Sequence, residues 1–231
     1  MQRNYQAKTS PGGFTLVELL GVMLIIAIFL GIGVNIVKDM DKGKSISSAI
    51  AISEGAFDEA RSKAIAGNGA ARLVIHNDPN EPERFRRYLA VAEFGRFDTT
   101  TNSFIPEDPD GGGAGEWTVT STGTLLPAKS YYDLNGSSLV GQNQTPTTMS
   151  IRLPGDNAAA VNCVFYEFNS EGIITAPGPG AGFVIFRGSF QPGASEPQPD
   201  LQDGQIVDAG GFVVWRLGNS SRIQNISQIN Y

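Results

Sequence analysis

The chain of 231 residues has little of the chemistry on which most enzyme sites depend. It contains one cysteine, Cys163, and one histidine, His76. A single cysteine excludes an intrachain disulfide. With so few thiolate and imidazole groups, no zinc-ligand set and no Ser-His-Asp or Cys-His arrangement has a distinctive spacing. We therefore expect no catalytic residues and no cofactor, a buried apolar role for Cys163, and a surface or capping role for His76 at a strand end.

Charged residues are also scarce, at 17% of the chain, and the net charge is −6. An acidic chain without a basic stripe argues against nucleic-acid binding. Arg84, Arg86 and Arg87 form the one notable basic cluster, which we expect to be solvated on an edge strand. The aromatic residues Trp117 and Trp215 are predicted to pack in the core or on a sheet face.

The glycine-rich segment 111–115 lacks the Lys-Ser/Thr pair of a phosphate-binding loop, so it predicts a flexible loop. Just before it, Asp108 and Asp110 could supply oxygen ligands to Ca²⁺, although the EF-hand spacing is absent. These two carboxylates are the only metal-ligand candidates.

Proline is missing from residues 14–37, where Thr15, Glu18 and Asn35 are the clearly polar residues. A helix over this segment would be about 36 Å long, which exceeds the ~30 Å hydrocarbon core of a bilayer. We therefore predict a transmembrane helix at 14–37. An acid in lipid is costly and usually functional, which singles out Glu18.

The position of the candidate cleavage site is unusual. A secretory signal has a shorter apolar region, with a small-residue cleavage site after it. Here the candidate site, Gly13–Phe14, comes before the apolar run. Cleavage would remove residues 1–13 with their two basic residues, Arg3 and Lys8, so a net charge of −6 would become −8. The apolar helix would remain on the mature protein.

The basic leader, the Gly13–Phe14 junction and Glu18 together resemble the class III signal of type IV prepilins and type II secretion pseudopilins. The resemblance implies that prepilin peptidase removes a cytoplasmic leader, 1–13, and N-methylates Phe14. It implies that Glu18 neutralises this amine, in its own or a neighbouring subunit. The alternative is that Glu18 only reaches the lipid headgroups.

The helix is predicted to continue over residues 38–67 as an amphipathic segment. Its apolar stripe falls on one face, interrupted by Ser53; the stripe comprises Ile46, Ile50, Phe57, Ala60 and Ala64. Glu59 and Lys63 are spaced as an ion pair on the opposite face. The sequence Gly67-Asn68-Gly69 is a stop signal.

Residues 70–231 are predicted to form a β-rich head, because short apolar runs alternate with Gly/Pro-rich loops. The expected strands are 71–75, 85–92, 116–120, 148–153, 161–169, 182–187 and 212–217, and the expected loops are 98–115, 135–147, 154–160 and 189–205. The fold class is therefore α+β, with a long N-terminal helix packed on an antiparallel sheet, as in pilins.

A narrower resemblance comes from residues 57–66 and the strand at 72–75, which are similar to the minor pseudopilin H/FimT family. The loops at 98–115 and 189–205 depart from that family as insertions. The resemblance implies a structural subunit of a type II secretion pseudopilus, anchored by a single span in the bacterial inner membrane with its head in the periplasm. The expected partners are prepilin peptidase, other pseudopilins or pilins, the assembly platform and secreted cargo. The alternatives are a type IV pilus subunit for adhesion or DNA uptake, and a membrane-anchored ligand-binding domain.

Overall fold

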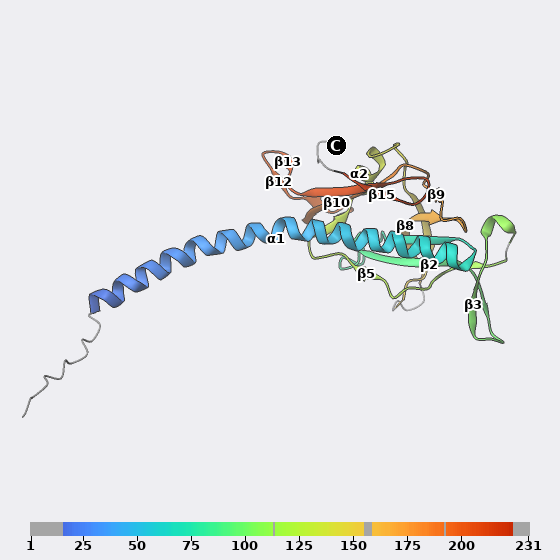
Figure 1. The fold of residues 1–231 in the computed structure, drawn as a ribbon, viewed down its shortest axis with the longest axis horizontal. Coiled ribbons are helices and arrows are strands. Elements are labelled where there is room, and N and C mark those ends of the chain that lie inside the picture. Colours follow the sequence, from blue (N-terminus) through green and yellow to red (C-terminus); the bar gives the residue numbers. More distant parts are fainter. Residues whose placement is uncertain (1–15, 113, 155–158, 192, 224–231) are drawn as a thin grey trace, which may run out of the picture. The chain divides into compact units, whose positions relative to one another are not determined.

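The computed structural model describes residues 16–112, 114–154, 159–191 and 193–223, with the backbone alone for 27–44 (Figure 1). The chain divides into two compact units, Met1–Asp41 and Lys42–Tyr231. Gly13 and Phe14, the residues of the expected cleavage site, lie outside the described residues.

Helix α1 is assigned over Leu16–Gly67 and is followed by a β-rich head. The first sheet contains β1 (Ala71–His76), β2 (Tyr88–Asp98), β3 (Ser103–Pro106), β4 (Glu116–Val119), β5 (Thr124–Leu125), β7 (Thr147–Ile151), β8 (Val161–Phe168) and β9 (Ile174–Ala176). The second contains β6 (Ser130–Tyr132), β10 (Ala181–Ser189), β11 (Gln198–Pro199), β14 (Ala209–Val214) and β15 (Ser220–Arg222). Outside these sheets lie η1 (Pro109–Gly111), α2 (Leu134–Leu139) and the hairpin of β12 (Leu201–Gln202) and β13 (Gln205–Ile206).

The first sheet has the order β3-β2-β1-β8-β7, with β4 and β5 on β2 and β9 on β8. The second has the order β11-β10-β14-β15, with β6 on β10. All of the strand pairs are antiparallel. The α+β class with antiparallel sheets is therefore confirmed.

Within the second unit, the last part of α1 packs on both sheets (Figure 1). Phe57 is the centre of this core. Its ring lies 4.9 Å from that of Tyr166 in the first sheet, and 5.3 and 5.2 Å from Phe183 and Phe212 in the second. Burying one such aromatic side chain contributes about 1.5–3 kcal/mol.

The predicted stripe is largely confirmed, since Ile46, Phe57, Ala60 and Ala64 are buried, while Ile50 is half-buried. Ser53 does not interrupt the buried face, because its Oγ donates a hydrogen bond to the carbonyl oxygen of Ala49 at 2.9 Å. A buried hydroxyl satisfied inside its own helix keeps the stripe continuous. The predicted interruption at Ser53 is therefore wrong.

The predicted end of the helix is confirmed, and Asn68 is the residue that turns the chain. Asn68 takes a left-handed conformation, with φ of 48°. The amide of Gly69 donates to the carbonyl oxygen of Ala64, and that of Asn68 to the carbonyl oxygen of Ile65. This pair of bonds is the Schellman motif, which satisfies carbonyl groups left open by the end of the helix.

Most predicted strands are present with shifted ends, but the loops hold more structure than expected. The second strand begins at Tyr88 rather than residue 85, because residues 82–87 form turns. The predicted loop 98–115 contains β3 and η1, and the loops 135–147 and 189–205 contain most of α2 and the small strands β11 and β12. Strand β6 was not predicted.

Candidate functional site

The start of α1 presents an unusual apolar surface. Across Leu16–Ile26 every described side chain is exposed, and the large apolar residues of this segment expose between 47% and 78% of their surface. Exposed apolar surface of this extent on one element indicates an interaction site. The segment is therefore the first candidate for function.

Glu18 lies in the first turn of α1, as the only acidic residue there. A carboxylate at this position interacts favourably with the positive end of the helix dipole. Because Gly13 and Phe14 are outside the described residues, the predicted pairing between Glu18 and the amine of Phe14 remains a prediction.

Within the residues that the structure describes, no helix is both long and apolar enough to cross a membrane. The predicted span at 14–37 includes two residues, Phe14 and Thr15, that the structure does not describe.

The comparisons with known proteins point to the same N-terminal segment. Residues 10–34 match the family described as the prokaryotic N-terminal methylation motif. No curated protein and no solved structure matches the chain significantly. The motif indicates a type IV pilin-like protein with a prepilin-type signal, and it includes Gly13, Phe14 and Glu18.

In the head, the histidine and the cysteine are both inaccessible. Cys163 is fully buried, as predicted. His76 is also fully buried, so the surface alternative of its predicted surface or capping role is wrong. Its Nδ1 accepts a long hydrogen bond from the amide of Asp78 at 3.5 Å, and its Nε2 lies 3.4 Å from Oε2 of Glu81. At the end of β1, the imidazole thus accepts a hydrogen bond from a backbone amide of the turn that follows.

The arginine cluster is not solvated on an edge strand, which corrects the sequence expectation. Arg86 is 5% exposed and pairs with Glu196 at 3.1 Å, while its Nε donates to Asn77. Arg84 and Arg87 donate to backbone carbonyls. The three side chains hold the turn before β2 against neighbouring segments, and the buried guanidinium of Arg86 is compensated by its carboxylate and amide partners.

Of the two candidate calcium ligands, Asp108 and Asp110, the first has a structural role. Asp108 caps η1, and its carboxylate accepts a hydrogen bond from the amide of Asp110 at 2.9 Å. Among the described residues, no group of three or more His, Cys, Asp or Glu side chains is arranged to hold a metal ion.

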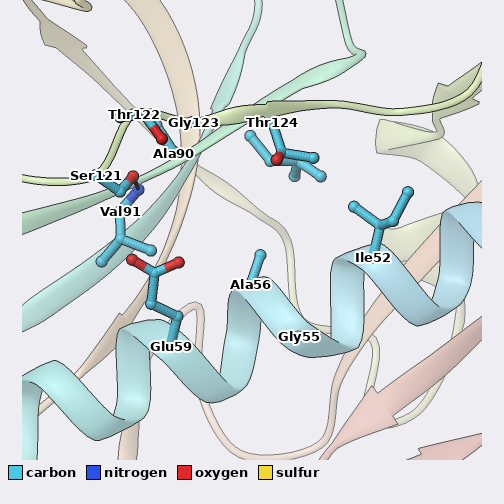
Figure 2. Close-up of a pocket in the computed structure, with 11 residues that line it drawn as sticks. Ile52, Gly55, Ala56, Glu59, Ala90, Val91, Ser121, Thr122, Gly123 and Thr124 are labelled. Atoms are coloured by element: carbon cyan, nitrogen blue, oxygen red, sulfur yellow. Dashed lines mark hydrogen bonds between the residues drawn. The ribbon is translucent and has the colours of Figure 1, made fainter.

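A cavity beside α1 borders the first sheet. This cavity, of about 300 Å³ (Figure 2), lies between α1, β2 and the segment before β5, and its lining residues are Ile52, Gly55, Ala56, Glu59, Leu89, Ala90, Val91, Ser121, Thr122, Gly123 and Thr124. In Figure 2 the carboxylate of Glu59 points from α1 towards Val91 and Ser121. Glu59 is the one titratable side chain in this lining, so no acid–base pair converges there.

Lys63 lies beside this cavity rather than on the far face of the helix. Its Nζ is 3.8 Å from Glu59, as the sequence predicted, but only 3.2 Å from Glu93 on β2 and 2.7 Å from the hydroxyl of Thr120. Lys63 therefore not only pairs with Glu59 on α1 but also links α1 to the first sheet.

No sequence pattern indicated the cluster around Arg72 on the opposite face of the first sheet. The guanidinium of Arg72 lies 3.8 Å from the ring centroid of Trp117 and 3.9 Å from that of Phe165. It also pairs with Glu167 at 2.6 Å. These residues are far apart along the chain, and only the strand register brings them together. Trp117 therefore packs on a sheet face as predicted, whereas Trp215 is 40% exposed.

Tyr132 and Tyr166 form a buried polar pair between the two sheets. Tyr166 donates to the carbonyl oxygen of Gly182 at 2.7 Å, and Tyr132 can then donate to the Tyr166 hydroxyl at 2.9 Å. Burial raises the pKa of both phenols well above the ordinary value. They therefore remain protonated donors and stabilise the core.

Proposed function

We propose that this chain is a minor pseudopilin, a structural subunit of a type II secretion pseudopilus. Prepilin peptidase removes residues 1–13 and methylates the new terminus at Phe14. The mature subunit is held in the inner membrane by its apolar helix before it enters a filament. The single observation that carries the proposal is the methylation motif at residues 10–34.

The exposed start of α1 supports the assembly step. Its apolar side chains are exposed, and we infer that lipid or neighbouring helices cover them. Glu18 is the one charged residue within Leu16–Ile26. In a low-dielectric environment, its carboxylate favours a register that brings a positive terminal amine beside it.

The head supports a structural rather than a catalytic role. Its most enclosed polar groups, among them Tyr132, Tyr166 and Arg86, are engaged in holding segments together. A head of this kind suits contacts with sister subunits or with secreted cargo.

Cleavage is tested with Gly13→Val, expressed in a host with prepilin peptidase. A β-branched residue at the bond to be cut should block the peptidase, so the full chain should persist as precursor with unmethylated Phe14. Gly12→Val is the matched control and should be processed like the wild type. Intact mass and N-terminal peptide mass spectrometry provide the measurement. Normal processing of Gly13→Val would overturn the cleavage assignment.

The particular machine is tested by deleting the gene in its host and measuring protein secretion and surface fibres separately. Loss of secretion with normal fibres is expected. Loss of surface fibres, adhesion or DNA uptake with normal secretion would instead assign the chain to a type IV pilus.

A further inference from the structure

The cavity between α1 and β2 has the composition of a small-ligand site. Its volume of about 300 Å³ is at the lower end of the range found for ligand pockets. One face of α1 and part of β2 provide its apolar lining, which consists of Ile52, Ala56, Leu89, Ala90 and Val91. The polar lining comes from Glu59 and from residues 121–124, three of which carry a hydroxyl group. A lining of this kind fits a ligand with an apolar body and one polar group.

The helix leaves this cavity open because Gly55, which lines it, has no side chain. A Cβ atom added to Gly55 would meet no atom of a neighbouring segment within 4 Å. At the floor of the cavity, Leu89 and Val91 are each 1% exposed, whereas Thr122 and Thr124 on the other wall are exposed. The cavity therefore combines an apolar floor with a mouth that is open to solvent.

The carboxylate of Glu59 keeps its capacity to accept hydrogen bonds. In Figure 2 it points from α1 towards β2, across one end of the cavity. Nζ of Lys63 donates to Glu93 at 3.2 Å and to Thr120 at 2.7 Å, but it lies 3.8 Å from Glu59, which is too far for a hydrogen bond. Among the described residues, none donates a hydrogen bond to this carboxylate. Its oxygen atoms can therefore bind a donor on a ligand.

The charges beside the cavity favour a cation as that ligand. Glu59, Glu93 and Lys63 form one group with two carboxylates and a single ammonium, so the group has one negative charge in excess. Glu93 is bonded to Lys63 and to the hydroxyl of Thr120, which leaves the excess charge on Glu59. A cation bound there would balance the charge, and the adjoining apolar lining would reduce screening by solvent.

We propose that the cavity binds an alkylammonium group, the chemistry shared by a free primary amine and by a lysine side chain of another polypeptide. The ammonium donates to the carboxylate of Glu59, and hydroxyl groups of residues 121–124 provide acceptors for its other donors. The alkyl chain lies on Ile52 and Ala56, whose apolar surface it removes from water. The proposal concerns a ligand of the head, so it depends neither on processing at the N-terminus nor on assembly through Glu18.

The first probe is n-butylammonium, titrated into the isotope-labelled full-length protein in detergent micelles. Binding should shift the amide resonances of residues 122–124. Glu59→Gln should weaken binding about tenfold, equivalent to ~1.4 kcal/mol, because it removes a charge-assisted hydrogen bond. The neutral alcohol 1-butanol, with the same alkyl chain, should bind the wild type as weakly. Asp58→Asn removes a charge from the exposed neighbouring position, outside the lining, and should bind like the wild type.

Gly55→Leu tests the cavity itself, because it fills the space and keeps the charge of Glu59. A side chain at Gly55 starts in open space, and leucine favours a helix more than glycine does, so the variant should fold. Thermal melting without ligand checks this. Binding of n-butylammonium should be lost. Ala51→Leu, one helical turn earlier at an exposed position outside the lining, is the matched control and should bind normally.

A second probe distinguishes the two sources of the alkylammonium group. It is a short peptide with one lysine between alanines and with both termini blocked, so that the side chain carries its only charge. Shifts at residues 122–124 with both probes would identify a lysine side chain as a ligand, whereas shifts with n-butylammonium alone would identify a free amine. The proposal is overturned if neither probe binds, if the shifts fall at other residues, if 1-butanol binds equally well, or if binding survives in either Glu59→Gln or Gly55→Leu.

Discussion

Arg72 illustrates how the head tolerates a charge on a largely apolar sheet face. Burial lowers the pKa of its guanidinium, and the neighbouring carboxylate of Glu167 opposes this shift. Stacking between Trp117 and Phe165 compensates further for lost hydration, because aromatic ring faces attract cations. The side chain thereby joins β4, β1 and β8.

Asp208 is a residue whose charge works against folding. Partial burial raises the pKa of its carboxyl, and Asp200 adds to the rise, although attraction to Arg187 lowers it. The folded-state pKa therefore lies above the unfolded value near 3.8. The ionised form is less favourable in the folded protein, and this destabilisation is present above the folded pKa and disappears as the pH falls below both values.

We predict that Asp208→Asn raises the melting temperature of the full-length protein at pH 7. The gain should shrink as the pH is lowered from 7 towards 4, because the wild-type carboxyl then becomes neutral. Thermal unfolding followed by circular dichroism across this range provides the measurement. Asp58→Asn, at an exposed position on α1, is the control. An equal gain at every pH would show that charge is not the cause.

At the scale of elements, the end of α1 depends on one left-handed residue. Asn68 adopts this conformation at less cost than other residues with a Cβ, and glycine adopts it at none. We predict that Asn68→Ala lowers the free energy of unfolding by about 1 kcal/mol, whereas Asn68→Gly keeps or slightly raises it. Urea unfolding of the full-length variants in detergent measures both. Equal stability of the alanine and glycine variants would contradict this account.

The same helix shows what local sequence can predict. Its buried stripe and its end depend on spacing and on residues next to one another, so Phe57, Ala60 and the stop at Asn68 were predictable. The role of Ser53 was not, because the period alone does not show that a hydroxyl bonds to its own helix. The motif that includes Gly13 and Glu18 was also predictable, because its residues lie close together in the sequence.

Long-range pairing explains what sequence reasoning missed. Arg86 was expected in solvent, but it is buried because Glu196, 110 residues later, reaches the turn before β2. Strand β6 is too short to show a pattern, and it exists because β10 pairs with it. The stacking of Arg72 on Trp117 and Phe165 follows from the order of four strands, β4, β2, β1 and β8. None of these features is encoded within one sequence window.

For the whole molecule, the described apolar residues fall into two groups, one buried in the head and one exposed at the start of α1. The head buries its own in contacts between α1 and the two sheets, whereas the segment Leu16–Ile26 exposes nearly all of them. Exposed apolar surface drives association without setting a register, because the hydrophobic effect is not directional. A single charge pair in such a surface does set one. Glu18 is thus the residue on which ordered assembly should depend.

We therefore predict that Glu18→Gln, which keeps the size of the side chain and removes its charge, leaves cleavage intact and impairs assembly. The variant should reach mature mass in the membrane fraction, but co-purify with its partner subunits at about a tenth of the wild-type amount or less, as expected for a loss of ~1.4 kcal/mol or more. Glu59→Gln, the same change on the head portion of α1, is the matched control and should assemble normally. Normal assembly of Glu18→Gln would exclude charge pairing as the source of register, whereas failure of both variants would indicate a general defect of the helix.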